Sequence, residues 1–207
     1  MTSQQPKQGG IGHTLFGAYA DYARRIAPIF MLCCFLFGFS LGMGYLLGGS
    51  LSSSIMTDLL GSLPDTSQMI LPELFGFIAA NNIVKSLIFM LGGVLGSVLP
   101  IFFVVFNGFI VGYVAYSIGS LYGTGFVVAG LVPHGIFEIS AILFSMSLGV
   151  SLGYTTLNSL RGQKVSLKDE AKQALGLFIT RVIPILLLAA AIETLITPAI
   201  LIQLGYV

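Results

Sequence analysis

The sequence predicts an all-α fold, a polytopic bundle of transmembrane helices, and three observations support this prediction. Charged residues make up only 8% of the 207 residues, whereas roughly 25% are charged in a typical soluble domain. Hydrophobic residues reach 56%, and the mean hydropathy is +0.96. The hydrophobic residues also form long continuous runs, without the strict alternation of membrane β-strands. The net charge of +1 gives no electrostatic reason to expect a nucleic-acid partner.

About five spanning helices are expected, because five apolar runs are long enough to form helices that cross a hydrocarbon core of about 30 Å. They cover residues 26–49, 82–97, 100–121, 125–157 and 177–204. We interpret residues 1–25 as an N-terminal tail with a juxtamembrane segment. Residues 26–207 then form a single integral membrane helical domain.

Two irregular features are predicted beside these spans. Residues 70–80 are apolar but too short to cross the membrane, so we expect a re-entrant or interfacial half-helix there. In the fourth span, Pro133 and Gly135 predict a broken helix, because proline lacks the amide donor and glycine tolerates irregular backbone. Broken helices of this kind are typical of transporter binding sites.

The distribution of Lys and Arg predicts the orientation in the cell membrane. Seven of the nine Lys and Arg residues lie within residues 1–25 or within the connection at residues 158–172, whereas residues 50–68 have none. With five spans, the two basic segments lie on the same side, and the positive-inside rule makes that side cytoplasmic. The C-terminus is then expected outside, together with residues 50–68.

The rare polar residues within the spans predict where a ligand binds. His134 and Glu138 are four residues apart, so both side chains lie on one face of a helix. An ionisable group at the bilayer centre costs about 2.5–3.5 kcal/mol on insertion scales, and such groups usually face a cavity or the protein interior. Further polar residues fall at a similar depth when about 1.5 Å is counted per residue. The predicted ligand-binding residues are Glu73, Asn81, Asn82, Asn107, His134, Glu138 and Glu193.

The same residues also have a structural interpretation, which the sequence leaves open. Asn107 would then hydrogen-bond across helices. Glu193 would form a buried ion pair with Lys85. His134 and Glu138 would satisfy backbone groups that the predicted break leaves free.

A metal site is another alternative. His134 and Glu138 would supply two ligands to a zinc ion, and a catalytic zinc takes three from the protein. The third ligand would come from Glu73 or Glu193. The spacing of His134 and Glu138 does not match the HExxH signature of zinc proteases, so no cofactor is assigned and zinc is kept as a candidate.

Glycine is abundant, at 26 of the 207 residues, and much of it is ordered. Pairs four residues apart let helices approach closely in membranes, and they also suit symmetric self-association. We therefore expect close helix packing and a homodimer or higher oligomer. The pairs are Gly38/Gly42, Gly44/Gly48, Gly92/Gly96, Gly108/Gly112 and Gly149/Gly153.

Three short motifs stand out in the membrane region. They are Asn81-Asn82, Phe106-Asn107-Gly108, and Pro133-His134-Gly135 followed by Glu138. Together they resemble the pattern of the stage II sporulation protein M family, over about residues 27–205. The resemblance implies a prokaryotic membrane protein in which Asn81, Asn82, Asn107, His134 and Glu138 are important.

The sporulation member of the family resembles a scaffold. It associates with partner proteins, and these partners degrade cell-wall peptidoglycan. Relatives also occur in bacteria and archaea that do not sporulate, so the sporulation role is not carried over. The expected partners are membrane lipids, a second copy of the chain, and membrane or cell-envelope proteins.

The function expected from these observations is that of a membrane scaffold or transport-associated component. It would bind a small ligand, ion or proton at the polar site and recruit partners. The alternative is an intramembrane hydrolase, in which Glu138 or Glu73 activates water as a general base and His134 assists, with or without zinc. A purely structural oligomer is the third class. A non-enzymatic role is preferred, and no catalytic residue is assigned.

Overall fold

The computed structural model describes residues 11–50 and 68–206. Over these ranges the chain is helical apart from short turns and contains no strand. Five helical segments are long and apolar enough to cross a membrane, which confirms the predicted fold class. They are Asp21–Ser50, Leu71–Leu95, Val98–Tyr122, Thr124–Leu160 and Leu167–Gln203. The tail at residues 1–10 and most of the predicted 50–68 loop lie outside the described residues.

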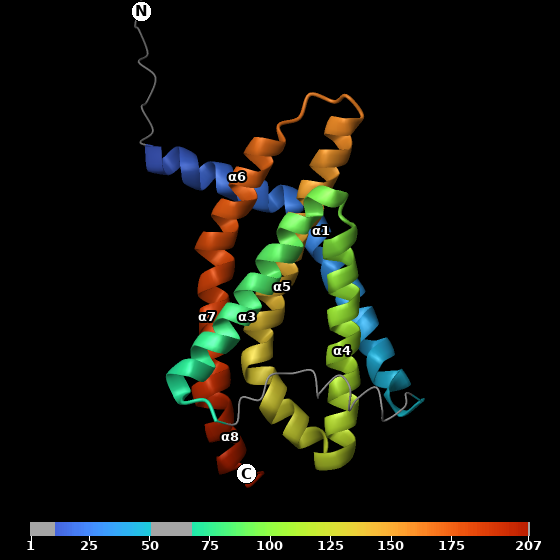
Figure 1. The fold of residues 1–207 in the computed structure, drawn as a ribbon, viewed down its shortest axis with the longest axis vertical. Helices are drawn as coiled ribbons and strands as arrows, with labels where there is room; N and C mark the ends of the chain where they lie inside the picture. Colours follow the sequence, from blue (N-terminus) through green and yellow to red (C-terminus); the bar gives the residue numbers. More distant parts are fainter. Residues whose placement is uncertain (1–10, 51–67, 207) are drawn as a thin grey trace, which may run out of the picture.

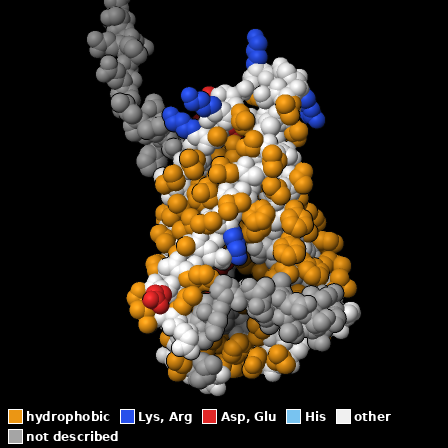
Figure 2. Space-filling model, in the orientation of Figure 1, with side chains coloured by type: hydrophobic (Ala, Val, Ile, Leu, Met, Phe, Trp, Pro, Cys, Tyr) orange, Lys and Arg blue, Asp and Glu red, His pale blue; other side chains and the backbone are white. Residues whose placement is uncertain are grey.

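Successive spans run in opposite directions along the bundle (Figure 1). The start of α1 and the α5–α6 connection lie at one end, which we call the basic end, and the C-terminus lies at the other. Figure 2 shows most of the visible Lys and Arg side chains at the basic end and hydrophobic side chains along the sides. The helices are α1 (Ile11–Leu47), η1 (Gly48–Ser50), α3 (Leu71–Leu91), η2 (Gly92–Leu95), α4 (Val98–Tyr122), α5 (Thr124–Leu160), α6 (Leu167–Leu177), η3 (Phe178–Val182), α7 (Ile183–Ala191), η4 (Ile192–Ile196) and α8 (Thr197–Gln203).

The predicted half-helix at residues 70–80 is wrong, because it is the first part of α3. Pro72 stands in the first turn, where a missing amide donor costs no helical hydrogen bond. The Glu73 carboxylate accepts the backbone N–H of Ile70 at 3.3 Å. Asn81 and Asn82 then continue the helix, since asparagine lowers helix propensity only modestly. The run and the predicted second span are therefore one continuous transmembrane helix.

The predicted break at Pro133 and Gly135 is also wrong, because α5 is helical throughout. Figure 1 shows the first part of α5 at an angle to the rest, which a proline inside a helix explains. The helix is held from several sides, since α5 contacts α1, α3, α4, α6, α7 and α8. The proline thus bends α5 without interrupting it.

The last span contains two π-helical turns, η3 and η4, which the sequence analysis did not predict. Each one comes just before a proline: Ile183 precedes Pro184, and Thr197 precedes Pro198. The backbone N–H of Ile183 and that of Thr197 each bond to the carbonyl five residues earlier. A proline ring clashes with the carbonyl four residues before it, and a wider turn relieves this clash.

Close helix packing confirms the role predicted for most of the glycines. A β-carbon at Gly93 would overlap the Gly149 carbonyl, and one at Gly112 would overlap the Leu41 carbonyl. Both members of three of the five predicted pairs, Gly44/Gly48, Gly108/Gly112 and Gly149/Gly153, would place an added β-carbon within 3 Å of a neighbour in this way. At Gly38/Gly42, in contrast, an added β-carbon would meet no atom of residues 11–50 or 68–206 within 4 Å.

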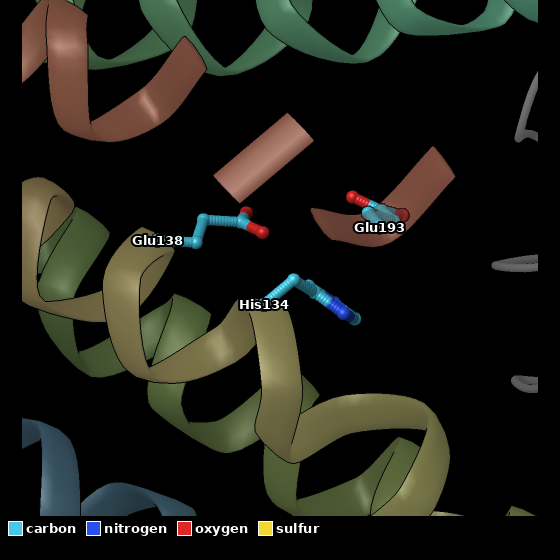
Figure 3. A group of neighbouring side chains, drawn as sticks. All are labelled: His134, Glu138 and Glu193. Atoms are coloured by element: carbon cyan, nitrogen blue, oxygen red, sulfur yellow. The ribbon is translucent and has the colours of Figure 1, made fainter. Parts of the chain in front are cut away.

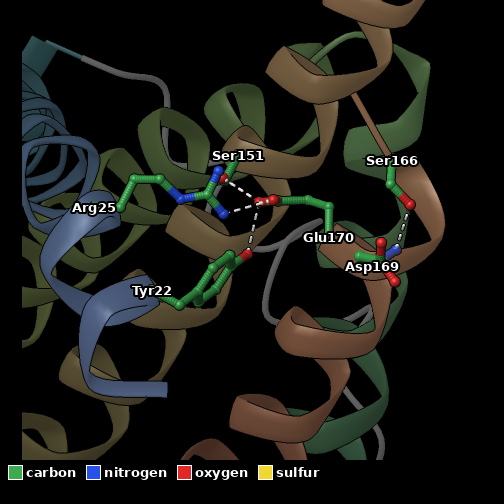
Figure 4. A network of polar contacts seen from close by, with 6 residues as sticks. All are labelled: Tyr22, Arg25, Ser151, Ser166, Asp169 and Glu170. Atoms are coloured by element: carbon green, nitrogen blue, oxygen red, sulfur yellow. Dashed lines mark hydrogen bonds and ion pairs between the residues drawn. The ribbon is translucent and has the colours of Figure 1, made fainter. Parts of the chain in front are cut away.

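The basic end is closed by a polar network around Glu170 (Figure 4). Glu170 is 4% exposed, and one carboxylate oxygen accepts hydrogen bonds from the Tyr22 hydroxyl at 2.9 Å and from the Ser151 hydroxyl. The other oxygen accepts from the Arg25 guanidinium at 2.6 Å. Ser166 begins α6, and its side chain accepts the Asp169 backbone N–H at 3.2 Å. Glu170 thereby ties α1 and α5 to α6.

Candidate functional site

A cavity of about 960 Å³ lies between α1, α3, α4, α5 and η4. We call it the polar cavity, because it has mostly apolar walls with several polar groups. Its volume falls within the range of roughly 300–1,000 Å³ that is typical of small-molecule sites. Six of the seven predicted ligand-binding residues line it: Asn81, Asn82, Asn107, His134, Glu138 and Glu193.

Glu73 is the predicted residue that the structure places elsewhere. It is exposed in the first turn of α3 and accepts the Ile70 amide, so its carboxylate caps a helix. An acidic residue here also interacts favourably with the helix dipole. Among the described residues, Glu73 belongs neither to the cavity lining nor to the cluster of possible metal ligands, so the structure does not bring it together with the other predicted residues.

Three ionisable side chains meet at the cavity wall (Figure 3). His134 and Glu138 project from successive turns of α5, and Glu193 comes from η4. One ligand-type atom from each lies within 4.8 Å of the others. The two carboxylates are half-buried, and His134 is 9% exposed. We call these three residues the His-Glu-Glu cluster.

The backbone around the cluster is shaped by proline on both helices. Pro133 directly precedes His134, and Pro198 follows the turn that carries Glu193. A π-helical turn changes the direction of the side chains on it relative to an α-helix, and such turns are frequent at functional sites. The direction of Glu193 toward α5 thus depends on a backbone feature, and not on periodicity alone.

Thr197 is a member of the site that the sequence analysis missed. Its hydroxyl lies 3.5 Å from Nδ1 of His134, and both residues are buried. Thr197 follows Glu193 by four residues, and the helical period of 3.6 places such residues on one face. This spacing was the signal that could have identified it.

The charges at the polar cavity do not cancel. Glu138 and Glu193 provide two carboxylates, and Lys85 from α3 provides one ammonium group that is itself exposed. The expected ion pair between Lys85 and Glu193 does not form, since the ion pairs among the described residues are Arg24–Asp21 and Arg25–Glu170. With both carboxylates ionised, the cavity favours a cationic ligand.

Three amide side chains provide further, neutral polar groups at the cavity wall. Asn81 donates to the Asn82 side-chain oxygen at 3.4 Å, both from α3. Asn107 reaches the cavity from α4, and its side chain makes no hydrogen bond among the described residues. Each amide can both donate and accept, so these side chains can orient a polar ligand or its water.

The comparisons with known proteins agree with the motifs. The family model described as stage II sporulation protein M matches residues 30–198. An uncharacterized protein of Methanocaldococcus jannaschii is 34% identical over 183 residues, which cover 85% of this chain and 96% of that protein. No solved structure matches the chain. The chain is thus a membrane protein of the stage II sporulation protein M family.

Proposed function

We propose that this protein is a membrane scaffold or transport-associated component whose polar cavity binds a small cation or a proton. The observation behind the proposal is the His-Glu-Glu cluster, in which three ionisable groups from two spans meet within 4.8 Å. Ionisable residues inside transmembrane segments are costly and commonly mark ion pathways or proton relays. A bound cation or proton would offset the charge of Glu138 and Glu193.

Ligand-dependent stability of the purified protein tests this function. Small cations, including alkali and divalent metal ions and primary amines, are added singly, and the pH is varied in a separate series. A ligand that binds the native state raises the melting temperature. The rise is expected in the wild type and in the Glu73→Gln control, and it should be lost in the Glu138→Gln/Glu193→Gln double variant. Equal responses of the wild type and the double variant to every cation and every pH would refute the proposal.

Partner recruitment is the second half of the proposal, and it is supported by membership of the family. The test is photo-crosslinking in the native host from Lys164 on the exposed α5–α6 connection. Crosslinks to a membrane or cell-envelope protein are expected. Crosslinks to lipid alone, from this position and from Gln203 at the opposite end, would contradict recruitment.

An intramembrane hydrolase is the second candidate function, and the His-Glu-Glu cluster is the observation that favours it. Glu138 would act as general base on a water molecule and His134 would assist, with Glu193 as a further polar group. Release of product from a membrane-embedded peptide, lost in Glu138→Gln but kept in Glu73→Gln, would support the hydrolase. Absence of turnover in a purified protein that still binds its cation would exclude it.

We propose that the basic end faces the cytoplasm and that the C-terminus faces outside. The orientation was derived by placing the two Lys- and Arg-rich segments on the same side of the membrane. These segments lie at the same end of the bundle (Figures 1 and 2), which supports the proposal. Single cysteines at Ser53 and Ser166, after replacement of Cys33 and Cys34 by alanine, test this proposal. An impermeant thiol reagent on intact cells is expected to label Ser53→Cys only. Labelling of Ser166→Cys alone would show the inverted orientation.

We also propose a homodimer or higher oligomer, formed through the outer face of α1. Gly38 and Gly42 are the predicted pair with open space around them, and the exposed rings of Phe35 and Phe39 stack beside them. Mass measurement in detergent is expected to show more than one copy, and Gly38→Leu should shift the equilibrium toward monomer. Gly76→Leu, also at an open glycine, is the matched control. A strict monomer at micromolar concentration would overturn the proposal.

A further inference from the structure

We infer that His134, Glu138 and Glu193 form a site for a divalent transition-metal ion of the zinc class, an inference that rests on the proposed cation binding by the polar cavity. The donor set is one imidazole nitrogen and two carboxylate groups. Imidazole suits zinc and other transition metals, whereas calcium and magnesium prefer oxygen ligands alone. The histidine therefore selects the class of ion.

Charge balance favours a divalent ion over a monovalent one. Ionised Glu138 and Glu193 contribute two negative charges, and a neutral His134 contributes none. The Lys85 ammonium at the same cavity is exposed and forms no ion pair with either carboxylate among the described residues, so it does not neutralise the cluster itself. A divalent ion cancels this charge within a membrane span, where an uncompensated charge is expensive. A monovalent ion would leave one carboxylate uncompensated.

The geometry requires only side-chain movement. Ligands of a tetrahedral zinc ion lie about 3.4 Å apart, from bond lengths of about 2.0–2.1 Å. The three ligand-type atoms already lie within 4.8 Å of one another. Glutamate side chains have rotatable bonds, and the carboxylates of Glu138 and Glu193 are half-buried, so they can approach an ion without a change in the backbone.

A second observation at His134 is independent of the carboxylates. The side chain is 9% exposed, and among the described residues its ring has one hydrogen-bond partner, the Thr197 hydroxyl at Nδ1. Metal-binding histidines commonly donate the N–H of the other ring nitrogen to a neighbouring oxygen, which fixes the tautomer. When Nδ1–H donates to Thr197, Nε2 keeps its lone pair for a metal ion. This arrangement positions a buried imidazole that has no other described partner for Nε2.

Three protein ligands leave a coordination position for a small molecule. Catalytic zinc sites keep such an open position for water or substrate, whereas structural sites use four protein ligands. Because the cluster lies at the wall of the polar cavity, the fourth ligand would come from the cavity. The amides of Asn81, Asn82 and Asn107 line the same cavity and can hydrogen-bond to that ligand.

The metal content and the zinc affinity of the full chain test the inference. Protein purified without chelator, then stripped and titrated with zinc chloride, is expected to bind about one ion per chain. His134→Asn and Glu193→Gln each remove a proposed ligand and should weaken zinc binding at least tenfold. Thr197→Val removes the hydroxyl that orients the His134 ring and should weaken zinc binding about tenfold. Glu73→Gln, which alters a carboxylate outside the cavity, is expected to bind zinc like the wild type.

X-ray absorption of the zinc-loaded wild type gives a readout that does not depend on variants. One imidazole and two carboxylate groups in the zinc shell are expected. A thiolate ligand from Cys33 or Cys34, or equal zinc affinity in all variants, would overturn the metal site. If zinc does not bind but protons or another cation stabilise the protein through Glu138 and Glu193, the metal inference is wrong and the proposed function stands. If no cation or proton acts through these residues, both fail.

Discussion

Replacing Glu170 by alanine is expected to lower the free energy of unfolding by about 2–4 kcal/mol, because three donors lose their acceptor at once. Tyr22 and Ser151 are buried, so their hydroxyls would lack a partner away from water. The Arg25 side chain is 54% exposed and can be hydrated, which keeps the loss below that of a fully buried pair. Chemical or thermal unfolding in detergent measures the change.

Two matched variants separate this network from other effects of substitution in α6. Asp169→Ala removes the neighbouring carboxylate, which is exposed, and should change stability by less than about 1 kcal/mol. Glu170→Gln keeps the size of the side chain and one acceptor oxygen, so its effect should be intermediate. If Glu170→Ala is as stable as Asp169→Ala, Glu170 does not hold α1 and α5 to α6.

The spans were predicted from the length of the apolar runs, but this criterion gives no information on the importance of Glu170. The α5–α6 connection was interpreted through its lysines and arginines, since these orient a membrane protein. Glu170 is surrounded by such residues in the sequence, and Arg25 is 145 residues away. Only the packing of α1 across α6 brings the two together.

The polar cavity was more predictable, because depth along a span is nearly linear in residue number. His134, Glu138, Asn107 and Glu193 were grouped by depth, and the structure places all four at one cavity. Depth does not give the direction of a side chain around the helix axis, however. The direction of the Glu193 side chain depends on the π-helical turn before Pro198. A prediction that assumes about 3.6 residues per turn throughout the span does not include this turn.

The errors at residues 70–80 and at Pro133 have a common physical origin. Both predictions took a local interruption for the end of a helix: the end of the apolar run at residue 80 in one case, and Pro133 followed by Gly135 in the other. Asn81 and Asn82 instead line the cavity from a continuous α3, and α5 bends at its proline. Packing against neighbouring helices stabilises these continuous helices beyond the local propensity of their residues.

Replacing Gly112 by alanine is expected to be one of the most disruptive single-methyl changes in the bundle. The new β-carbon would overlap the Leu41 carbonyl, which is backbone and cannot move aside like a side chain. Helices α1 and α4 would have to separate, at a cost of about 1–3 kcal/mol or more for overpacking. Unfolding in detergent is the measurement, with Gly76→Ala in α3 as the control in open space. Gly76→Ala should be neutral or stabilising by up to about 1 kcal/mol, because alanine favours helix.

The same variant links packing to the proposed function. Leu41 from α1, and Val111 and Asn107 from α4, line the polar cavity, so separation of the two helices widens it. Gly112→Ala is therefore expected to weaken cation binding as well as stability, whereas Gly76→Ala should leave both unchanged or slightly improved. If Gly112→Ala loses stability but binds its cation with wild-type affinity, the walls from α1 and α4 do not contribute to binding. The site would then reside on α3, α5 and η4 alone.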